Sequence, residues 1–215
     1  MRIVGIIGGI ASGKSRLADQ FRDWGAVVLD ADSIGHELLN RPDIAQAIRE
    51  RWGDQVFNDA GDVDRKKLAA SVFRSPESHE NRELLALESL LHPEIRRRVE
   101  EEIGQAIARK ESVLVIDAPL LIEAGWNEIC NEILFVNAPE ELRLARARRR
   151  GWTDEEFRHR ELAQVSLQQK KQAATFVIDN SGDWSETIRT ARQLWNCWLS
   201  EGKSGKEDHL AGGLN

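Results

Sequence analysis

The residues best suited to chemistry stand in one short stretch near the start of the chain, GGIASGKS, residues 8–15. Gly8, Gly13, Lys14 and Ser15 satisfy the pattern G-x-x-x-x-G-K-[ST]. Glycines let the backbone turn tightly and aim its N–H groups inward, which forms an anion-binding nest at a helix amino terminus. Lys14 can then reach the β- and γ-phosphates of a nucleotide, and the Ser15 hydroxyl can coordinate Mg²⁺. The stretch therefore predicts a loop that binds nucleotide phosphates.

Acidic side chains end two apolar runs further along the chain. Asp30 and Asp32 alternate at the end of AVVLD, so they are expected to point to different faces. A carboxylate here could accept a proton from an attacking hydroxyl, although helix capping or a solvated turn explains it equally well. Asp117 ends VLVID, where P-loop proteins often hold Mg²⁺ through water; it could also cap a turn.

Five arginines occur between residues 142 and 151, in LRLARARRRG. At helical spacing Arg143, Arg146 and Arg150 share one face. Guanidinium groups grip phosphate bidentately and stabilise the charge on a transferring phosphoryl group. A solvated helix face is the alternative. Beside a phosphate loop, we favour a mobile lid that carries one or two functional arginines.

Five short apolar runs, rich in β-branched residues, predict strands at 2–8, 26–30, 113–117, 133–137 and 175–179. The spacing of apolar residues predicts helices between them, at 15–24, 94–110, 140–150 and 184–199. Strands that alternate with helices predict an α/β fold, with a five-stranded parallel sheet flanked by helices on both faces.

The chain of 215 residues is long enough for one α/β domain with inserts, predicted over residues 1–200. We assign the core to residues 1–32, 112–142 and 172–200. The long, mostly helical stretch 33–111 is expected to be an insert, and the charged stretch 143–171 a lid. Residues 201–215 have little to bury and are expected to be disordered.

Composition limits the classes of function. A formal net charge of -6 argues against a protein whose main role is to bind nucleic acid. Cys130 and Cys197 lack metal-site spacing, which favours two reduced thiols. No apolar run is long enough for a bilayer, and no signal sequence is evident, so we expect a cytoplasmic protein without a membrane partner. Composition does not determine the oligomeric state. We expect a monomer or a weak homo-oligomer.

The loop alone serves kinases, GTPases and motor ATPases. The sequence shows neither a GTPase-like N-K-x-D nor a helicase DExx box. These absences favour a small-molecule kinase.

The order of the motifs resembles that of the dephospho-coenzyme A kinase family over about residues 1–182. The matching pieces are GIIGGIASGKS, VLDADSIGHEL, VDRKKLAASVFRSPE, LLHPEIRRRV, VIDAPLLIEAG, the arginine helix and ELAQVSLQQKKQAATFVIDNSG. The loop is widely shared, whereas D-A-D, H-P-E-I and P-L-L-x-E together are far more specific. The resemblance implies a P-loop kinase fold with a helical substrate-binding insert and a lid. It also implies ATP and Mg²⁺ as cofactors and dephospho-coenzyme A as the substrate, phosphorylated on its ribose 3′-hydroxyl.

The resemblance also implies roles for individual residues. Asp32 would be the base that faces the 3′-hydroxyl, and Lys14 and Arg146 would act in catalysis. Ser15 and Asp117 would hold the metal. The remaining nucleotide contacts would come from the loop, the lid and the segment after the last strand, at Gly8, Gly9, Ile10, Ala11, Ser12, Gly13, Arg150, Asn180 and Gly182. The acceptor would be bordered by His92, Pro119, Leu120 and Glu123, although His92 and Glu123 could equally serve packing, capping or ion pairing.

The chain departs from the family pattern at four positions. The family usually has Gly at Ala11, Thr at Arg16, Gln at Arg143 and Asp at Thr175. The central chemistry does not depend on these positions.

Two other functions remain open. Another small-molecule kinase, such as a nucleoside monophosphate kinase, would need phosphate-binding arginines in the insert, which Arg41, Arg49, Arg51 and Arg65 could supply. A nucleotide-dependent regulatory protein would need ordered switches and a residue that positions water, and neither is evident.

Overall fold

The computed structural model describes residues 1–72 and 82–204. Most of the tail that is predicted to be disordered, residues 205–215, lies outside the described residues. The chain divides into two compact units. We call Met1–Asp30 together with the chain from Ile103 onward the core unit, and Ala31–Glu102 the insert unit.

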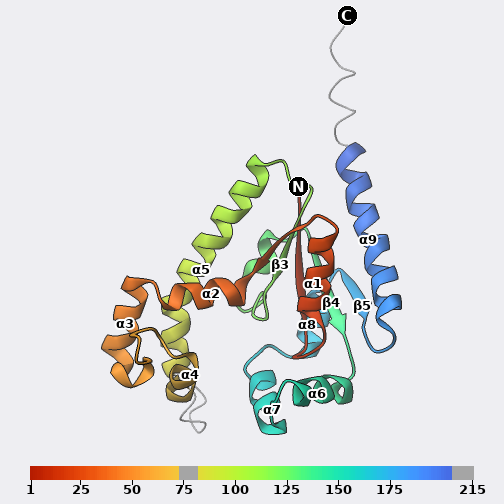
Figure 1. Ribbon diagram of the computed structural model, residues 1–215. Coiled ribbons are helices and arrows are strands. Elements are labelled where there is room, and N and C mark those ends of the chain that lie inside the picture. Colours follow the sequence, from red (N-terminus) through yellow and green to blue (C-terminus); the bar gives the residue numbers. More distant parts are fainter. Residues whose placement is uncertain (73–81, 205–215) are drawn as a thin grey trace, which may run out of the picture. The chain divides into compact units, whose positions relative to one another are not determined.

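The core unit is built on a parallel sheet of five strands, as the sequence predicts (Figure 1). The strand order is β2-β3-β1-β4-β5. The strands are β1 (Arg2–Gly8), β2 (Val27–Asp30), β3 (Val113–Asp117), β4 (Glu132–Asn137) and β5 (Phe176–Asp179). Each strand ends within one residue of its predicted bounds.

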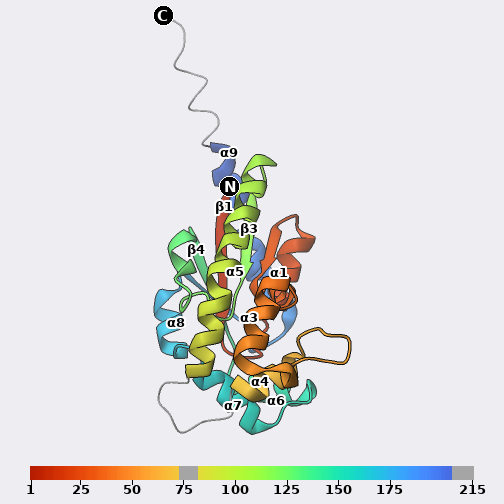
Figure 2. The same cartoon turned by 90° about the vertical axis from the view of Figure 1, so that its left-hand side faces the viewer.

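Helix α5 (Arg82–Ala108) connects the two units. Among the described residues, five other helices accompany the sheet in the core unit. They are α1 (Lys14–Asp23), α6 (Glu140–Arg149), α7 (Asp154–Leu162), α8 (Leu167–Ala173) and α9 (Trp184–Ser204), with a 3₁₀ turn, η2, at Trp126–Ile129. In the two views of the ribbon, α1 covers one face of the sheet and α8 the other (Figures 1 and 2). Among the described residues, no helix is both long enough and apolar enough to span a lipid bilayer.

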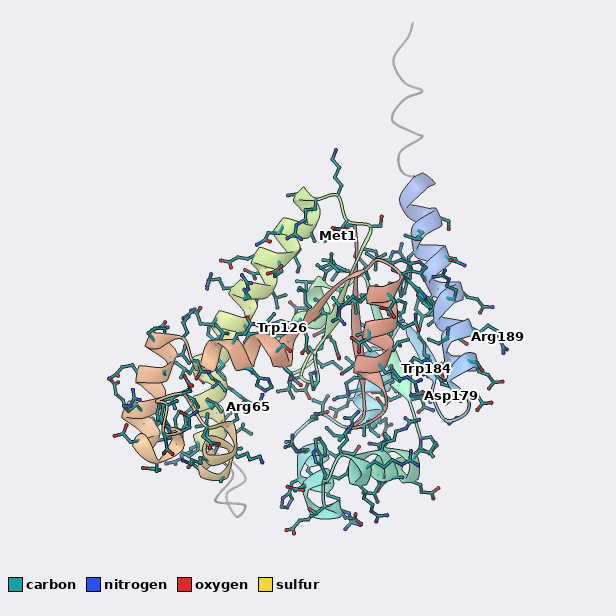
Figure 3. All side chains as sticks on the ribbon, viewed as in Figure 1. Met1, Arg65, Trp126, Asp179, Trp184 and Arg189 are labelled. Atoms are coloured by element: carbon teal, nitrogen blue, oxygen red, sulfur yellow. The ribbon has the colours of Figure 1, made fainter. Side chains whose placement is uncertain are left out.

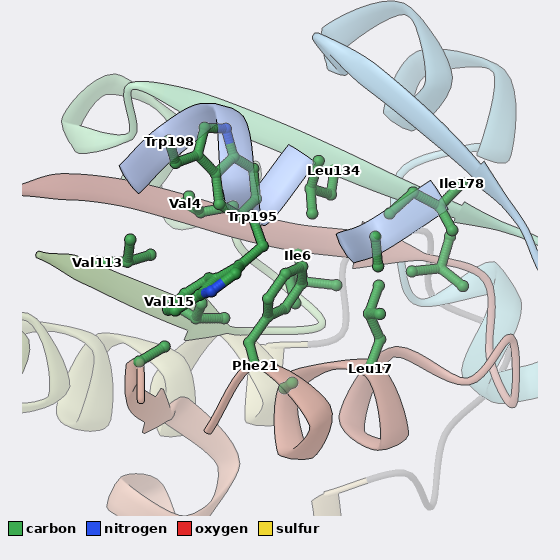
Figure 4. Packing of buried hydrophobic residues seen from close by; sticks show 14 residues of the cluster. Val4, Ile6, Leu17, Phe21, Val113, Val115, Leu134, Ile178, Trp195 and Trp198 are labelled. Carbon is green, nitrogen blue, oxygen red and sulfur yellow. The ribbon is translucent and has the colours of Figure 1, made fainter. Parts of the chain in front are cut away.

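One hydrophobic cluster joins α1 and α9 to the sheet (Figure 4). Because side chains alternate along a strand, Val4 and Ile6 of β1 point into this cluster. Phe21 of α1 is fully buried, with its ring 5.4 Å from that of Trp198 and 6.1 Å from that of Trp195. Burial of these large aromatic surfaces holds α9 against α1.

The insert unit has a hydrophobic core of its own. Its elements are α2 (Ala31–Leu39), α3 (Pro42–Trp52), the 3₁₀ turn η1 (Asp54–Val56), α4 (Arg65–Val72) and the greater part of α5 (Arg82–Ala108). Ile44, Ile48 and Trp52 of α3 pack with Leu68 of α4. These residues form a hydrophobic cluster drawn from the insert unit's own helices.

Two features differ from the predicted elements. The helix expected from Glu94 begins at Arg82 and runs through Pro93, because apolar residues at helical spacing, including Leu87 and Leu91, pack against the core of the insert unit. Asp32 is not part of a strand end. The strand β2 stops at Asp30, and Asp32 lies in the first turn of α2.

Replacing Phe21 with alanine is expected to destabilise the protein by about 3–5 kcal/mol, because it leaves a cavity between the packed rings of Trp24 and Trp198. Urea unfolding followed by circular dichroism measures this loss. Phe176→Ala is the matched control, because Phe176 lies on the edge strand β5 with 38% of its surface exposed. Equal losses in the two variants would contradict the packing described.

The two cysteines should differ in reactivity. Cys130 donates its S–H to the carbonyl of Trp126, and burial raises its pKa to about 12, whereas Cys197 is exposed. A disulfide reagent at pH 8 should therefore modify one thiol quickly in the native protein and two after denaturation. Cys197→Ser should abolish the fast phase; a persisting fast phase would contradict the assignment.

Candidate active site

The phosphate loop connects β1 to α1, and its glycines are required by its shape. Gly13 has φ of 107°, a backbone conformation that L side chains rarely adopt. A Cβ atom at Gly13 would collide with the side-chain nitrogen of Asn180, and one at Gly8 would lie 2.6 Å from the carbonyl oxygen of Val136. The loop is thus enclosed by β4 and by the segment after β5.

The carbonyl groups of the loop are held by side chains around it. Lys14 Nζ donates to the carbonyls of Gly9 at 3.1 Å and Gly8 at 3.4 Å. Three further side chains donate to the carbonyls of the next three residues. Arg143 donates to Ile10, Arg146 donates to both Ala11 and Ser12, and Asn180 also donates to Ser12. Since the C=O and N–H of a peptide link point in opposite directions, these bonds orient the loop amides for an anion.

Ser12 gives a second sign of a phosphate ligand. Its side chain is fully buried, and among the described residues its hydroxyl has no hydrogen-bond partner. A buried hydroxyl without a partner costs about 1–3 kcal/mol. A phosphate oxygen bound in the loop would satisfy it.

Arg146 joins the loop to the end of the sheet. Its Nη1 donates to the Ser12 carbonyl at 3.0 Å, and its Nη2 donates to the Asn180 carbonyl at 2.9 Å. Desolvation lowers the pKa of Arg146, and repulsion from Arg16, Arg150 and Arg149 lowers it further. Positive charge is therefore concentrated beside the loop, where a bound anion would relieve the repulsion.

Arg143 and Arg146, which the helical spacing places on one face with Arg150, both donate to carbonyls of the loop, but Arg143 is buried. Its side chain is 2% exposed and ion-paired with Glu161 of α7, and its Nε donates to the Ala138 carbonyl at 3.1 Å. A Cβ atom on Gly9 would lie 2.6 Å from Arg143 Nη1. Arg143 therefore supports the loop as a buried side chain. Arg150, at the C-cap of α6, is exposed.

Asn180 also supports the loop. Its side chain is 4% exposed and donates to the Ser12 carbonyl at 2.6 Å, while its own amide oxygen accepts from Thr187 Oγ1 at 3.3 Å. The family resemblance implies that Asn180 and Gly182 contact the nucleotide, but it does not imply this contact of Asn180 with the loop. Gly182 lies exposed in the bend before α9.

Oxygen ligands for a metal ion are present in the core unit. Asp117 ends β3, is 6% exposed, and stands in register with Ile6 of β1 and Asp30 of β2. The Ser15 hydroxyl is exposed in the first turn of α1, a turn that contains no acidic residue. Mg²⁺ is commonly bound by one or two protein oxygens together with substrate phosphates, so Ser15 and Asp117 fit this ion.

The turn after β3 is tied to the segment between α7 and α8. Glu123 accepts a hydrogen bond from the Val165 amide at 2.8 Å. Lys170, 1% exposed, donates to the Pro119 carbonyl at 3.1 Å and to Gln164 Oε1 at 2.6 Å. Burial lowers the pKa of Lys170. The turn expected to border the acceptor, with Pro119, Leu120 and Glu123, is thus fixed by a lysine that sequence reasoning missed.

His92, the other expected acceptor residue, lies apart from this turn in the chain. It belongs to α5 in the insert unit, where it is half-buried beside Pro93.

A cavity of about 230 Å³ adjoins the loop within the core unit. Gly9, Arg143 and Lys171 line it, together with the end of β4.

A parallel sheet whose first strand runs into a glycine-lysine-serine loop, with arginines gathered beside that loop, defines a P-loop kinase. The sequence profile of the dephospho-CoA kinase family (CoaE) matches residues 2–186. The dephospho-CoA kinase of Corynebacterium diphtheriae is 38% identical over 203 residues, which cover 94% of this chain and 99% of that protein.

Two solved structures have the same fold. TT1252 from Thermus thermophilus superposes with a TM-score of 0.75 at 34% identity, covering 91% of this chain and 96% of that one. Dephospho-CoA kinase from Campylobacter jejuni superposes with a TM-score of 0.69 at 22% identity, covering 94% of this chain and all of that one. The chain belongs to the dephospho-CoA kinase family, and is therefore an ATP-dependent kinase. Neither alternative function is supported by these matches.

Ala11 tests the geometry of the loop. Its φ of 56° is left-handed, which costs a residue with a side chain about 1–2 kcal/mol. Ala11→Gly removes this strain but gives the unfolded chain more freedom, so a net gain in stability of up to about 1 kcal/mol is expected. Ala145→Gly, at an exposed position inside α6, should instead lose about 1 kcal/mol. Thermal unfolding checks both signs, and losses in both variants would contradict the left-handed loop.

Proposed function

We propose that this kinase transfers the γ-phosphoryl group of ATP to the ribose 3′-hydroxyl of dephospho-coenzyme A. The observation that carries the proposal is the phosphate loop, with the carbonyls of residues 8–12 tied to side chains and a buried Ser12 hydroxyl awaiting a partner. The family match supports the choice of acceptor.

Asp32 is the base that accepts the proton of the attacking hydroxyl. Its position in the chain supports this role. Asp32 stands two residues after the end of β2, and β2 pairs with β3 in the sheet. Ligands of open α/β sheets bind at the carboxyl ends of the strands. A carboxylate there can orient the alcohol and remove its proton as the phosphoryl group transfers.

Lys14 and Arg146 stabilise the transferring group. Lys14 neutralises the β- and γ-phosphate oxygens, and Arg146 adds a second cation. A guanidinium has five N–H donors, so the three bonds of Arg146 to backbone carbonyls leave donors for phosphate. Ser15 and Asp117 would hold a Mg²⁺ ion, which when bound supplies further positive charge against the phosphate oxygens.

The segment 143–171 is the lid that excludes water. It contains most of α6, all of α7 and the greater part of α8, and the ion pair between Arg143 and Glu161 joins α6 to α7. Exclusion of water favours transfer to the alcohol over hydrolysis of ATP. His92, Pro119, Leu120 and Glu123 border the acceptor.

The arginines of the insert unit argue against a nucleoside monophosphate kinase. Arg41 pairs with Asp43 and Glu94, and pairs with single carboxylates engage Arg49 and Arg51. Three of the four arginines that such a kinase would use for phosphate therefore already have acidic partners.

The protein is proposed to work in the cytoplasm, as a monomer or weak homo-oligomer, without nucleic acid. Two free cysteines and a net charge of -6 support this setting.

Replacing Asp32 with asparagine should lower turnover with dephospho-coenzyme A by about 10²- to 10⁴-fold, because the amide cannot accept the proton. ADP affinity should stay the same, which calorimetry can verify. Asp59→Asn is the control, since Asp59 is an exposed acid of the same unit. Near-normal turnover in Asp32→Asn with unchanged nucleotide binding would remove Asp32 from the role of base.

The choice of acceptor is tested by incubating the enzyme with ATP and Mg²⁺ and detecting the product by mass. Dephospho-coenzyme A should gain one phosphate, and AMP should gain none. Faster phosphorylation of AMP would favour the monophosphate kinase. Slow ATP hydrolysis that neither acceptor accelerates would favour a regulatory protein.

A further inference from the structure

Arg16 and Trp184 form a stacked pair at the phosphate-loop end of the core unit. The guanidinium carbon of Arg16 lies 4.0 Å from the centroid of the Trp184 ring. Arg16 is the third residue of α1, and Trp184 is the first residue of α9. Figure 3 shows Trp184 at the end of α9 that lies beside Asp179, the last residue of β5. The pair thus joins the helix that follows the loop to the segment that follows the sheet.

The indole ring is held in a fixed position. Trp184 is partly buried against the hydrophobic cluster of the sheet, α1 and α9. The start of α9 is anchored by Thr187, whose hydroxyl donates to the Asp179 carbonyl at 2.8 Å and lies 3.3 Å from Asn180 Oδ1. Since the platform is rigid, an arginine stacked on it has already lost much of its rotational freedom.

The charge of Arg16 is directed toward a concentration of cations. Among the side chains described, those of residues 1–72 and 82–200, no carboxylate forms an ion pair with Arg16. Its charge acts on Arg146, which in turn bonds to the loop at Ser12 and to the Asn180 carbonyl. An exposed guanidinium beside other guanidinium groups is stabilised by a bound anion.

We infer that Arg16 binds the α-phosphate of the nucleoside di- or triphosphate, and that Trp184 is the positioning residue that orients its guanidinium. This inference rests on the proposed use of ATP and adds a nucleotide contact to it. Lys14 serves the β- and γ-phosphates, so the α-phosphate and nucleoside leave the loop past the first turn of α1. Arg16 stands one residue beyond Ser15 in that turn.

Arginine at this position changes how the nucleotide is held. A planar guanidinium can donate two parallel hydrogen bonds to a phosphate, which a short hydroxyl side chain cannot do. The indole face keeps the guanidinium plane fixed while its N–H edges remain available. The pair contacts a phosphate and not the base, so it should raise the affinity for all nucleoside di- and triphosphates and should not discriminate between bases.

The test is the dissociation constant of ADP, measured by calorimetry without an acceptor. Arg16→Thr should weaken ADP binding about tenfold or more, the effect of losing one charged hydrogen bond to phosphate. Trp184→Leu should weaken it by a smaller factor, whereas Trp184→Phe, which keeps an aromatic face, should retain most of the affinity. The Arg16→Thr, Trp184→Leu double variant should lose about as much as Arg16→Thr alone, because the tryptophan acts through the arginine.

The chain offers a matched control in Arg192, which stacks on Trp24 at 4.6 Å, just beyond the opposite end of α1. Arg192→Thr removes one positive charge and one stacked pair, and should leave the ADP dissociation constant unchanged.

Two results would overturn the inference: an unchanged ADP dissociation constant in Arg16→Thr, or an equal loss in Arg192→Thr. Additive losses in the double variant would overturn the positioning role of Trp184. Because ADP binding needs no acceptor, these outcomes are independent of whether dephospho-coenzyme A is the substrate.

Discussion

The structure depends on one constraint, that five successive peptide links between β1 and α1 must turn their carbonyls toward protein donors. A loop of this shape includes a left-handed alanine and two glycines at positive φ, so it is unfavourable by itself. Side chains from other segments hold it in place. Lys14 comes from the first turn of α1, Arg143 and Arg146 come from α6, and Asn180 directly follows β5.

These donors explain why the loop needs the whole core unit. The sheet fixes where α6 and Asn180 stand relative to β1, because β4 lies between β1 and β5. The aromatic cluster of α1 and α9 holds these two helices together near the end of α1 that lies away from the loop. Arg143 extends the arrangement to α7 through Glu161, so the lid segment and the loop share a support. Packing far from the phosphates therefore contributes to the geometry that binds them.

The sequence predicts the local parts of this arrangement and misses the long-range parts. Each strand is an unbroken apolar run ended by glycine or a polar residue, and the loop pattern is contiguous, so both are visible without a structure. The burial of Arg143 depends on Glu161 and on two backbone carbonyls, none of which its helical spacing reveals. Lys170 and Lys171 look alike in sequence, and Lys170 is buried because it donates to the Pro119 carbonyl and to Gln164, two partners distant from it in the chain or not evident from its spacing. The predicted helix starts at Glu94, whereas packing of the leucines before Pro93 extends α5 through this proline.

The most direct test of the central claim is the affinity of Asn180→Ala for inorganic tripolyphosphate and for ADP, measured side by side by calorimetry. If the Asn180 amide serves to hold the Ser12 carbonyl outward, the substitution weakens both ligands by a similar factor of about ten, equivalent to about 1.4 kcal/mol. If tripolyphosphate binds the variant as tightly as the wild type while ADP alone is weakened, Asn180 acts on the nucleoside. In that case the loop does not depend on its side-chain ties, and the account is wrong.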